Sequence, residues 1–249
     1  MQRKSEGGFS EVLHPKNAKE AFEVLLSPRE EGGKRQLLGL LLLWTLAAFS
    51  RPPGLEGWSA EVLGWDFRFY LIWSKSAMII GQVATILVLL AMRRWPIDDC
   101  LLAAVSEATC VPENLLLLAI SGPDLAWMLA LVLVFSLMHN FTEIGVTAAA
   151  SRIVTSAEHA RLFGLLAALR LLTSPLQRLT YADLTHAAED TFPSAQYLVA
   201  AAFACLNASL AANLYRRRPR RRQRGEGCAG GRRGGGQGGK MAVDVEVYF

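Results

Sequence analysis

The sequence predicts an all-α membrane protein whose core is a six-transmembrane-helix bundle. Apolar residues make up 52% of the 249 residues, and the mean hydropathy is +0.26. Charge gathers in the two ends, 1–35 and 216–249, while the middle is rich in Leu, Ala and Val. A soluble helical protein would carry charge along one face of every helix. Here the long segments are apolar on all sides, as lipid requires.

The elements follow in order along the chain. Residues 1–35 are polar, of mixed charge and without the apolar core of a signal peptide, and we expect a cytoplasmic interdomain linker there. Pro52 and Pro53 end the first apolar segment early, Pro112 interrupts the third, and Pro175 kinks the fifth. The predicted spans are 36–50, 68–92, 100–120, 125–149, 160–182 and 195–214. The last segment, 215–249, is expected to be a disordered, basic, Gly/Arg-rich cytoplasmic tail.

The charges between the spans predict the topology. Lys and Arg are frequent before the first span, between the second and third, between the fourth and fifth, and after the sixth. The remaining connections hold few, with Arg51 alone in the first of them. Because positive loops stay in the cytoplasm, this alternation places both termini of a multi-pass protein on the cytoplasmic side.

Several classes of protein are not expected. The cysteines Cys100, Cys110, Cys205 and Cys228 show no CxxC or CxxH spacing, so we predict neither a disulfide framework nor a metal site. No phosphate-binding, zinc-protease or serine-hydrolase motif occurs, and we expect no enzyme activity and no cofactor. The Gly/Arg tail has no interleaved aromatic residues to stack on bases, so nucleic acid is not an expected partner.

Short motifs stand at the ends of these segments in a recognisable order. They are Gly64-Trp65-Asp66, Asp98-Asp99-Cys100-Leu101, Ser151-Arg152-Ile153-Val154 with Glu158, Arg161 and Phe163, then Tyr181, and finally Thr191-Phe192-Pro193-Ser194. Over about residues 8–216, this order resembles the C-terminal half of the proton-coupled folate transporter and thymic stromal cotransporter family, solute carrier family 46. That family belongs to the major facilitator superfamily, whose members pack two six-helix halves around a central site.

The resemblance implies a function and several partners. The chain would be a fragment, half of a secondary transporter that lacks its N-terminal half, in a plasma or endolysosomal membrane. It would move a small organic solute, with an organic anion and coupling to protons as the specific hypotheses. Two alternatives stay open: a truncated remnant that does not transport, and a membrane scaffold or interaction protein.

Three ionisable residues at membrane depth are the main site candidates. Arg170 lies about 15 Å into the fifth span, where an arginine costs about 3 kcal/mol unless it is paired. His139 and Glu143 are four residues apart in the fourth span, which puts them on one helix face at about 15 and 9 Å depth. We expect Arg170 to hold negative charge and the His139/Glu143 pair to carry protons, with a structural polar contact as the alternative.

Two further pairs are predicted. Lys75 and Glu113 lie at matched depths in the second and third spans, which favours a structural ion pair between them. By the resemblance, Arg152 and Glu158 in the cytoplasmic connection after the fourth span are gating-loop residues, whose salt bridges would break and re-form during transport.

Overall fold

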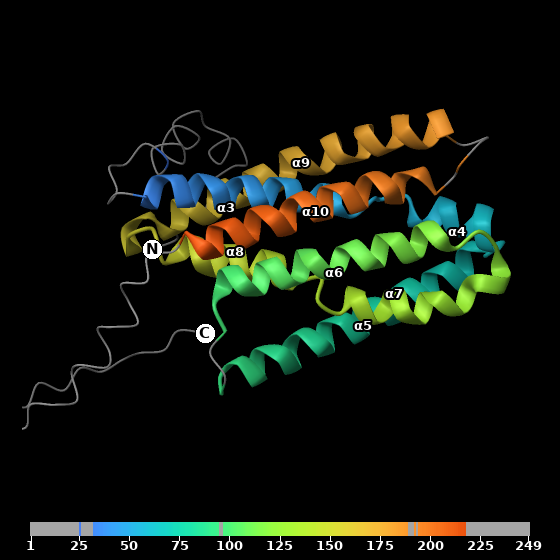
Figure 1. The fold of residues 1–249 in the computed structure, drawn as a ribbon, viewed down its shortest axis with the longest axis horizontal. Coiled ribbons are helices and arrows are strands. Elements are labelled where there is room, and N and C mark those ends of the chain that lie inside the picture. The colour runs from blue at the N-terminus through green and yellow to red at the C-terminus, as the bar shows by residue number, and fades with distance from the viewer. Residues whose placement is uncertain (1–24, 26–31, 95–96, 189–191, 193, 218–249) are drawn as a thin grey trace, which may run out of the picture. The chain divides into compact units, whose positions relative to one another are not determined.

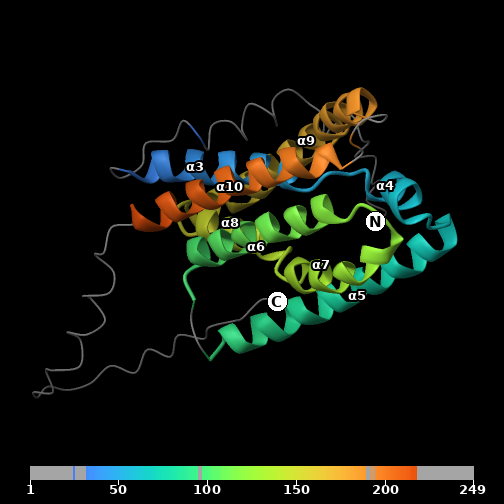
Figure 2. The ribbon, with the colours of Figure 1, turned by 45° about the vertical axis from the view of Figure 1, so that its right-hand side comes forward.

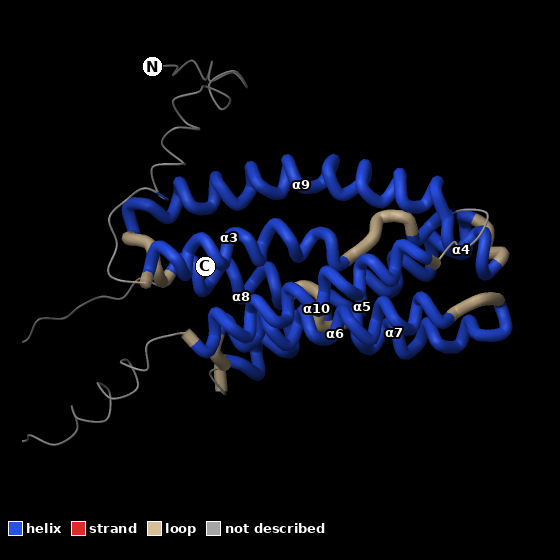
Figure 3. Tube along the Cα trace, turned by 45° about the horizontal axis from the view of Figure 1, so that its top comes forward, coloured by secondary structure: helices blue, strands red, loops and turns tan. Residues whose placement is uncertain are grey.

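The computed structural model describes residues 25, 32–94, 97–188, 192 and 194–217. The chain divides into two units, Met1–Arg216 and Arg217–Phe249, and every described helix belongs to the first. In this part of the chain all regular structure is helical, which confirms the predicted all-α class (Figure 3). Most of the expected linker at 1–35 and of the expected tail at 215–249 lies outside the described residues.

Five described segments are long and apolar enough to cross a membrane, which makes the chain a multi-pass membrane protein. They are Gly33–Leu63, Phe67–Met92, Asp99–Ala119, Pro123–Ser151 and Ala195–Arg216. The fifth predicted span, 160–182, falls in helix α9 (His159–Ala188), whose 30 residues would suffice for a span. The arginines of α9, among them Arg170 and Arg178, lower its hydropathy, so the count of six stays a prediction.

The first span is longer than its sequence indicated. Helix α3 (Gly33–Ala47) continues into the 3₁₀ turn η1 (Ala48–Ser50), and after a short break the chain resumes as α4 (Leu55–Leu63) in the same direction (Figure 1). Pro52 and Pro53 therefore follow a helix that ends at Ser50, as expected, but the apolar helical segment resumes after them and extends to Leu63. Arg51 consequently lies within the bundle and not in an external loop.

Aspartate caps begin the next two helices. The side chain of Asp66 accepts a hydrogen bond from the Phe69 amide at the start of α5 (Phe67–Met92), and Asp98 accepts one from the Cys100 amide before α6 (Asp99–Ala119). Helix α6 continues through Pro112, so the expected interruption of the third span is not found. Proline is tolerated inside membrane helices where neighbouring groups satisfy the freed backbone.

The fourth span is broken in its middle. It consists of the 3₁₀ segment η2 (Pro123–Met128), α7 (Leu129–Ser136) and α8 (Phe141–Ser151), with turns at 137–140 (Figure 1). The expected continuous helix over 125–149 was therefore wrong. After α8, the short η3 (Ser156–Glu158) leads into α9.

Helix α10 (Ala195–Arg216) lies at the centre of the bundle. It packs against α6, α3 and η1, and α6 in turn packs against α7 and α8. Helices α5 and α9 lie at opposite edges of the bundle (Figures 1 and 2). Gly145 allows the closest helix approach, because a Cβ there would lie 2.5 Å from the backbone oxygen of Asp99 in α6.

Two apolar clusters fill the bundle, one toward each end. The first is built on α3, α8 and the start of α9, with Cys100 and Ala103 from the beginning of α6. The second is built on α4, α7 and Tyr197, with Leu117 from the end of α6. Between them α6 carries a buried polar layer at residues 106–114, which coincides with both helix breaks.

Candidate functional site

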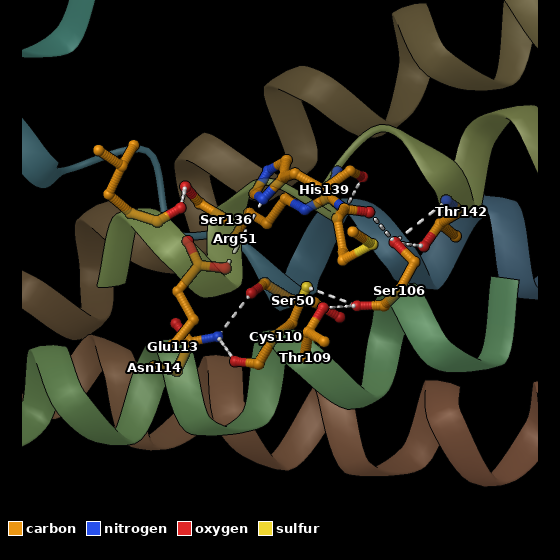
Figure 4. A network of polar contacts seen from close by, with 12 residues as sticks. Ser50, Arg51, Ser106, Thr109, Cys110, Glu113, Asn114, Ser136, His139 and Thr142 are labelled. Atoms are coloured by element: carbon orange, nitrogen blue, oxygen red, sulfur yellow. Dashed lines mark hydrogen bonds and ion pairs between the residues drawn. The ribbon is translucent and has the colours of Figure 1, made fainter. Parts of the chain in front are cut away.

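Several side chains of the polar layer come from one face of α6. Ser106, Cys110, Glu113 and Asn114 recur at helical spacing (Figure 4). Glu107 follows Ser106 in the same helix. Glu107 is completely buried, and Ser106, Cys110 and Asn114 are nearly so. Polar groups at this depth are stable only when they have partners, and the two helix breaks supply them.

The break after η1 contributes Ser50 to the layer. Its hydroxyl donates to Glu107 Oε2 at 2.9 Å and accepts from Asn207 Nδ2 of α10 at 2.8 Å. The Ser50 carbonyl, which loses its helical partner at the break, accepts from Asn114 Nδ2 at 3.0 Å. Ser50 thus connects η1, α6 and α10 through three buried hydrogen bonds.

Helix α9 satisfies the remaining carbonyls of this break. Gln177 Nε2 donates to the Ala48 carbonyl at 2.8 Å and also to the Arg51 carbonyl, and the Tyr181 hydroxyl donates to the Phe49 carbonyl. These contacts place α9 against the break and give Gln177 and Tyr181 a structural role.

The break at 137–140 meets α6 from the other side. The Ser106 hydroxyl donates to the Met138 carbonyl at 2.6 Å, and the Thr142 hydroxyl donates to Glu107 Oε1 at 2.7 Å. Both carboxylate oxygens of Glu107 therefore accept a hydroxyl, one from each break. The sequence alone offered no partner for Glu107, because Ser50 and Thr142 are 57 and 35 residues away.

The two breaks also contact each other directly. The Arg51 guanidinium donates to the backbone carbonyl of His139. His139 Nδ1 lies 3.7 Å from Glu113 Oε2, and the His139 side chain is 32% exposed. The region where the two interrupted spans meet thus contains five reactive or charged groups. They are the imidazole of His139, the thiol of Cys110, the carboxylates of Glu107 and Glu113, and the guanidinium of Arg51.

Glu143 and Arg170 form an ion pair that links α8 to α9. The structure therefore brings together two of the three residues predicted at membrane depth. The pair is open, since the side chains are 38% and 61% exposed. His139 does not join it, because the turns at 137–140 remove the continuous helix on which the shared-face expectation rested.

The predicted Lys75–Glu113 ion pair is not formed. Glu113 faces His139, and Lys75 is exposed on α5, at the edge of the bundle. The pair was predicted only because the two residues lie at matched depths in their spans. Among the described helices, α5 and α6 share no extensive contact. Matched depth along two helices does not make them neighbours.

The gating-loop candidates occupy the connection after α8. Arg152 pairs with Asp99 at the start of α6, with Nη1 and Oδ2 3.1 Å apart. Glu158 closes a capping box with Thr155 at the beginning of η3. Arg152 thus ties two helices together, and Glu158 caps the start of η3. The sequence did not predict Asp99 as the partner of Arg152, because an aspartate at this position is also typical of the first turn of a helix.

Comparison with known proteins gives no family assignment. No protein-family model matches this chain, and none of the curated proteins shows significant similarity to it. The fold and the polar layer define a helical, multi-pass membrane protein with interrupted spans. The resemblance to solute carrier family 46 rests on the sequence motifs alone.

Proposed function

We propose that this chain is one six-helix half of a major-facilitator-type secondary transporter, with both termini in the cytoplasm, which moves a small organic anion together with protons. One observation carries the proposal: two spans are interrupted, and both interruptions meet one buried polar layer on α6. Interrupted spans whose freed backbone groups lie near mid-membrane are typical of substrate and ion sites in transporters.

Helix α9 is the fifth of the six spans in this proposal. It contacts α3 and α10, and its hydrogen bonds to the break after η1 hold it along the bundle. Its outer surface exposes Leu171, Leu172 and Leu179, each by 66% or more. Such a surface suits lipid or the apolar face of a second half.

Arg170 is the anion-holding group and Glu143 its competing partner. In the ion pair, the Glu143 carboxylate occupies the guanidinium. A proton on Glu143 would remove that competitor and free Arg170 for a bidentate contact with a solute carboxylate. Proton binding and anion binding are thereby linked, which is the requirement for symport.

The arrangement also accounts for a need for a second half. Arg170 and Glu143 are partly exposed on the side of the bundle and not enclosed by it. A second six-helix bundle packed on this side would turn the exposed pair into one wall of a central cavity. The salt bridge between Arg152 and Asp99 would then belong to the cytoplasmic closure of that cavity.

The test is solute-dependent proton movement. The full chain is reconstituted in liposomes that contain a pH-sensitive dye, and a panel of small mono- and dicarboxylates is added under an inward proton gradient. If two copies of the chain pair as the two halves in these liposomes, at least one anion should acidify the lumen, and Arg170→Ala and Glu143→Gln should abolish the signal. Arg93→Ala, at an exposed arginine after α5, is the matched control and should leave it intact. A signal unchanged in Arg170→Ala would overturn the assignment.

The same preparation separates binding from movement. A solute that binds the folded chain raises its melting temperature, whether or not it is transported. Stabilisation that is lost in Arg170→Ala, without lumenal acidification, would mean that this chain binds solute but cannot move it alone. Absence of both signals over the whole panel would favour the remnant or the scaffold.

A further inference from the structure

Three side chains in the polar layer converge from two elements. Cys110 and Glu113 are three residues apart on one face of α6, and His139 approaches them from the break between α7 and α8 (Figure 4). The Cys110 sulfur, a Glu113 oxygen and a ring nitrogen of His139 all lie within 4.8 Å of one another. Sequence spacing could not reveal this set, because its histidine stands 26 positions after Glu113 in another span.

The distances suit ligands of one ion better than partners in a hydrogen bond. His139 Nδ1 and Glu113 Oε2 are 3.7 Å apart, which is too long for a hydrogen bond. Around a tetrahedral Zn²⁺, nitrogen, oxygen and sulfur ligands stand about 3.4–3.6 Å from one another. His139 Nδ1 is also buried without a hydrogen-bond partner, so a lone pair or a proton there is left unsatisfied.

The surrounding charges favour a cation. Arg51 and Glu107 are close enough to act on both Cys110 and His139. With both carboxylates ionised, Arg51 balances only one of Glu107 and Glu113, which leaves one excess negative charge inside the bundle. A divalent ion that displaces the Cys110 thiol proton into water adds one net positive charge, and the cluster becomes neutral. Neutrality lowers the cost of burying charged groups.

We propose that Cys110, Glu113 and His139 bind a divalent transition-metal ion of the Zn²⁺ class. A thiolate, an imidazole and a carboxylate form a ligand set that Zn²⁺ accepts, and hard ions such as Mg²⁺ and Ca²⁺ avoid thiolate. Three protein ligands leave a fourth position for water or another small ligand. The partial exposure of His139 gives an entry path. The site is distinct from the Glu143–Arg170 pair and does not depend on transport.

The experiment uses Co²⁺ as the spectroscopic probe on the full chain, purified in detergent. The expected result is one equivalent of Co²⁺ with the strong visible absorption of a tetrahedral ion and a sulfur-to-metal charge-transfer band in the near ultraviolet. Zn²⁺ should displace it. Cys110→Ser should remove the charge-transfer band and weaken binding at least tenfold. Glu113→Gln and His139→Ala should each weaken Co²⁺ binding at least tenfold. Because both variants keep the sulfur ligand, the charge-transfer band should still appear at higher Co²⁺ concentrations.

The controls are two of the three cysteines outside the cluster. Cys205→Ser, at an exposed position of α10, and Cys228→Ser, in the tail, should both leave the titration unchanged. The proposal is overturned if the wild-type chain shows no tetrahedral Co²⁺ spectrum, or if the charge-transfer band survives Cys110→Ser. It is equally overturned if both Glu113→Gln and His139→Ala, eluting as monodisperse protein, bind as tightly as wild type. The measurement involves no solute, so its failure leaves the transport proposal standing, and the reverse holds as well.

Discussion

The Glu107 network and the Glu143–Arg170 pair are both polar assemblies within membrane-span-like helices, yet they differ in what surrounds them. Glu107 is completely buried, and each of its oxygens accepts a hydroxyl from a different helix break. Glu143 and Arg170 are 38% and 61% exposed and contact each other across α8 and α9. In the buried assembly, both carboxylate oxygens of Glu107 have hydrogen-bond partners within the protein, and these bonds hold the helix breaks in place. The open pair retains room for another ligand, so the first should govern stability and the second activity.

Removal of Glu107 should have the largest effect on stability. Glu107→Ala leaves a cavity and deprives the Ser50 and Thr142 hydroxyls of their common acceptor, and we expect a loss of about 3 kcal/mol in the free energy of unfolding. Glu107→Gln keeps an acceptor oxygen and should cost about 1 kcal/mol. Denaturant unfolding in detergent measures both. Equal stability of Glu107→Ala and wild type would contradict the proposed role of the network.

The close approach of α8 to α6 sets the geometry of this network. Gly145→Ala places a Cβ 2.5 Å from the Asp99 backbone oxygen, and the helices must separate, at a cost of about 2 kcal/mol. Gly164→Ala is the matched control, because nothing lies within 4 Å of its Cβ in α9. That control should stabilise the chain by about 0.5 kcal/mol through helix propensity. Thermal unfolding of the two variants distinguishes a packing effect from a general effect of glycine replacement.

The carbonyl freed at the first break provides a smaller test. Asn114→Ala removes the donor to the Ser50 carbonyl and should cost about 1.5 kcal/mol. Gln82→Ala, at an exposed position of α5, should stay within about 0.5 kcal/mol of wild type. A comparable loss in both variants would show that the effect comes from polar groups in general and not from the break.

The same contrast explains what could be predicted from the sequence. Apolar length was enough to locate the multi-pass helices, because lipid imposes it on each segment separately. The Glu143–Arg170 contact was also accessible, since two opposite charges occurred at comparable depth in consecutive spans, but the same reasoning failed for Lys75 and Glu113. These are local or nearest-neighbour properties.

The polar layer could not be predicted from the sequence in this way. Pro52 and Pro53 predicted the end of a span, because a proline pair usually stops a helix. In the structure the chain resumes as α4, and Gln177 and Tyr181 donate hydrogen bonds to the freed carbonyls. The turns at 137–140 contain neither proline nor glycine, and their partners come from α6. Glu107 and His139 depend on contacts between spans that are distant in the sequence.

The smallest stability effect, and the sharpest contrast with Glu107, is expected at Arg170. An exposed ion pair contributes about 0–1 kcal/mol, so Arg170→Ala should change the free energy of unfolding by no more than that. The same variant should lose the anion-dependent response entirely, because no other group replaces its guanidinium. A double-mutant cycle with Glu143→Gln measures the coupling between the two side chains directly. If the coupling exceeds about 2 kcal/mol, the pair is a structural clamp like the Glu107 network, and the anion site must be sought elsewhere. A weak coupling with complete loss of the response would establish that the fold leaves this arginine available for a ligand.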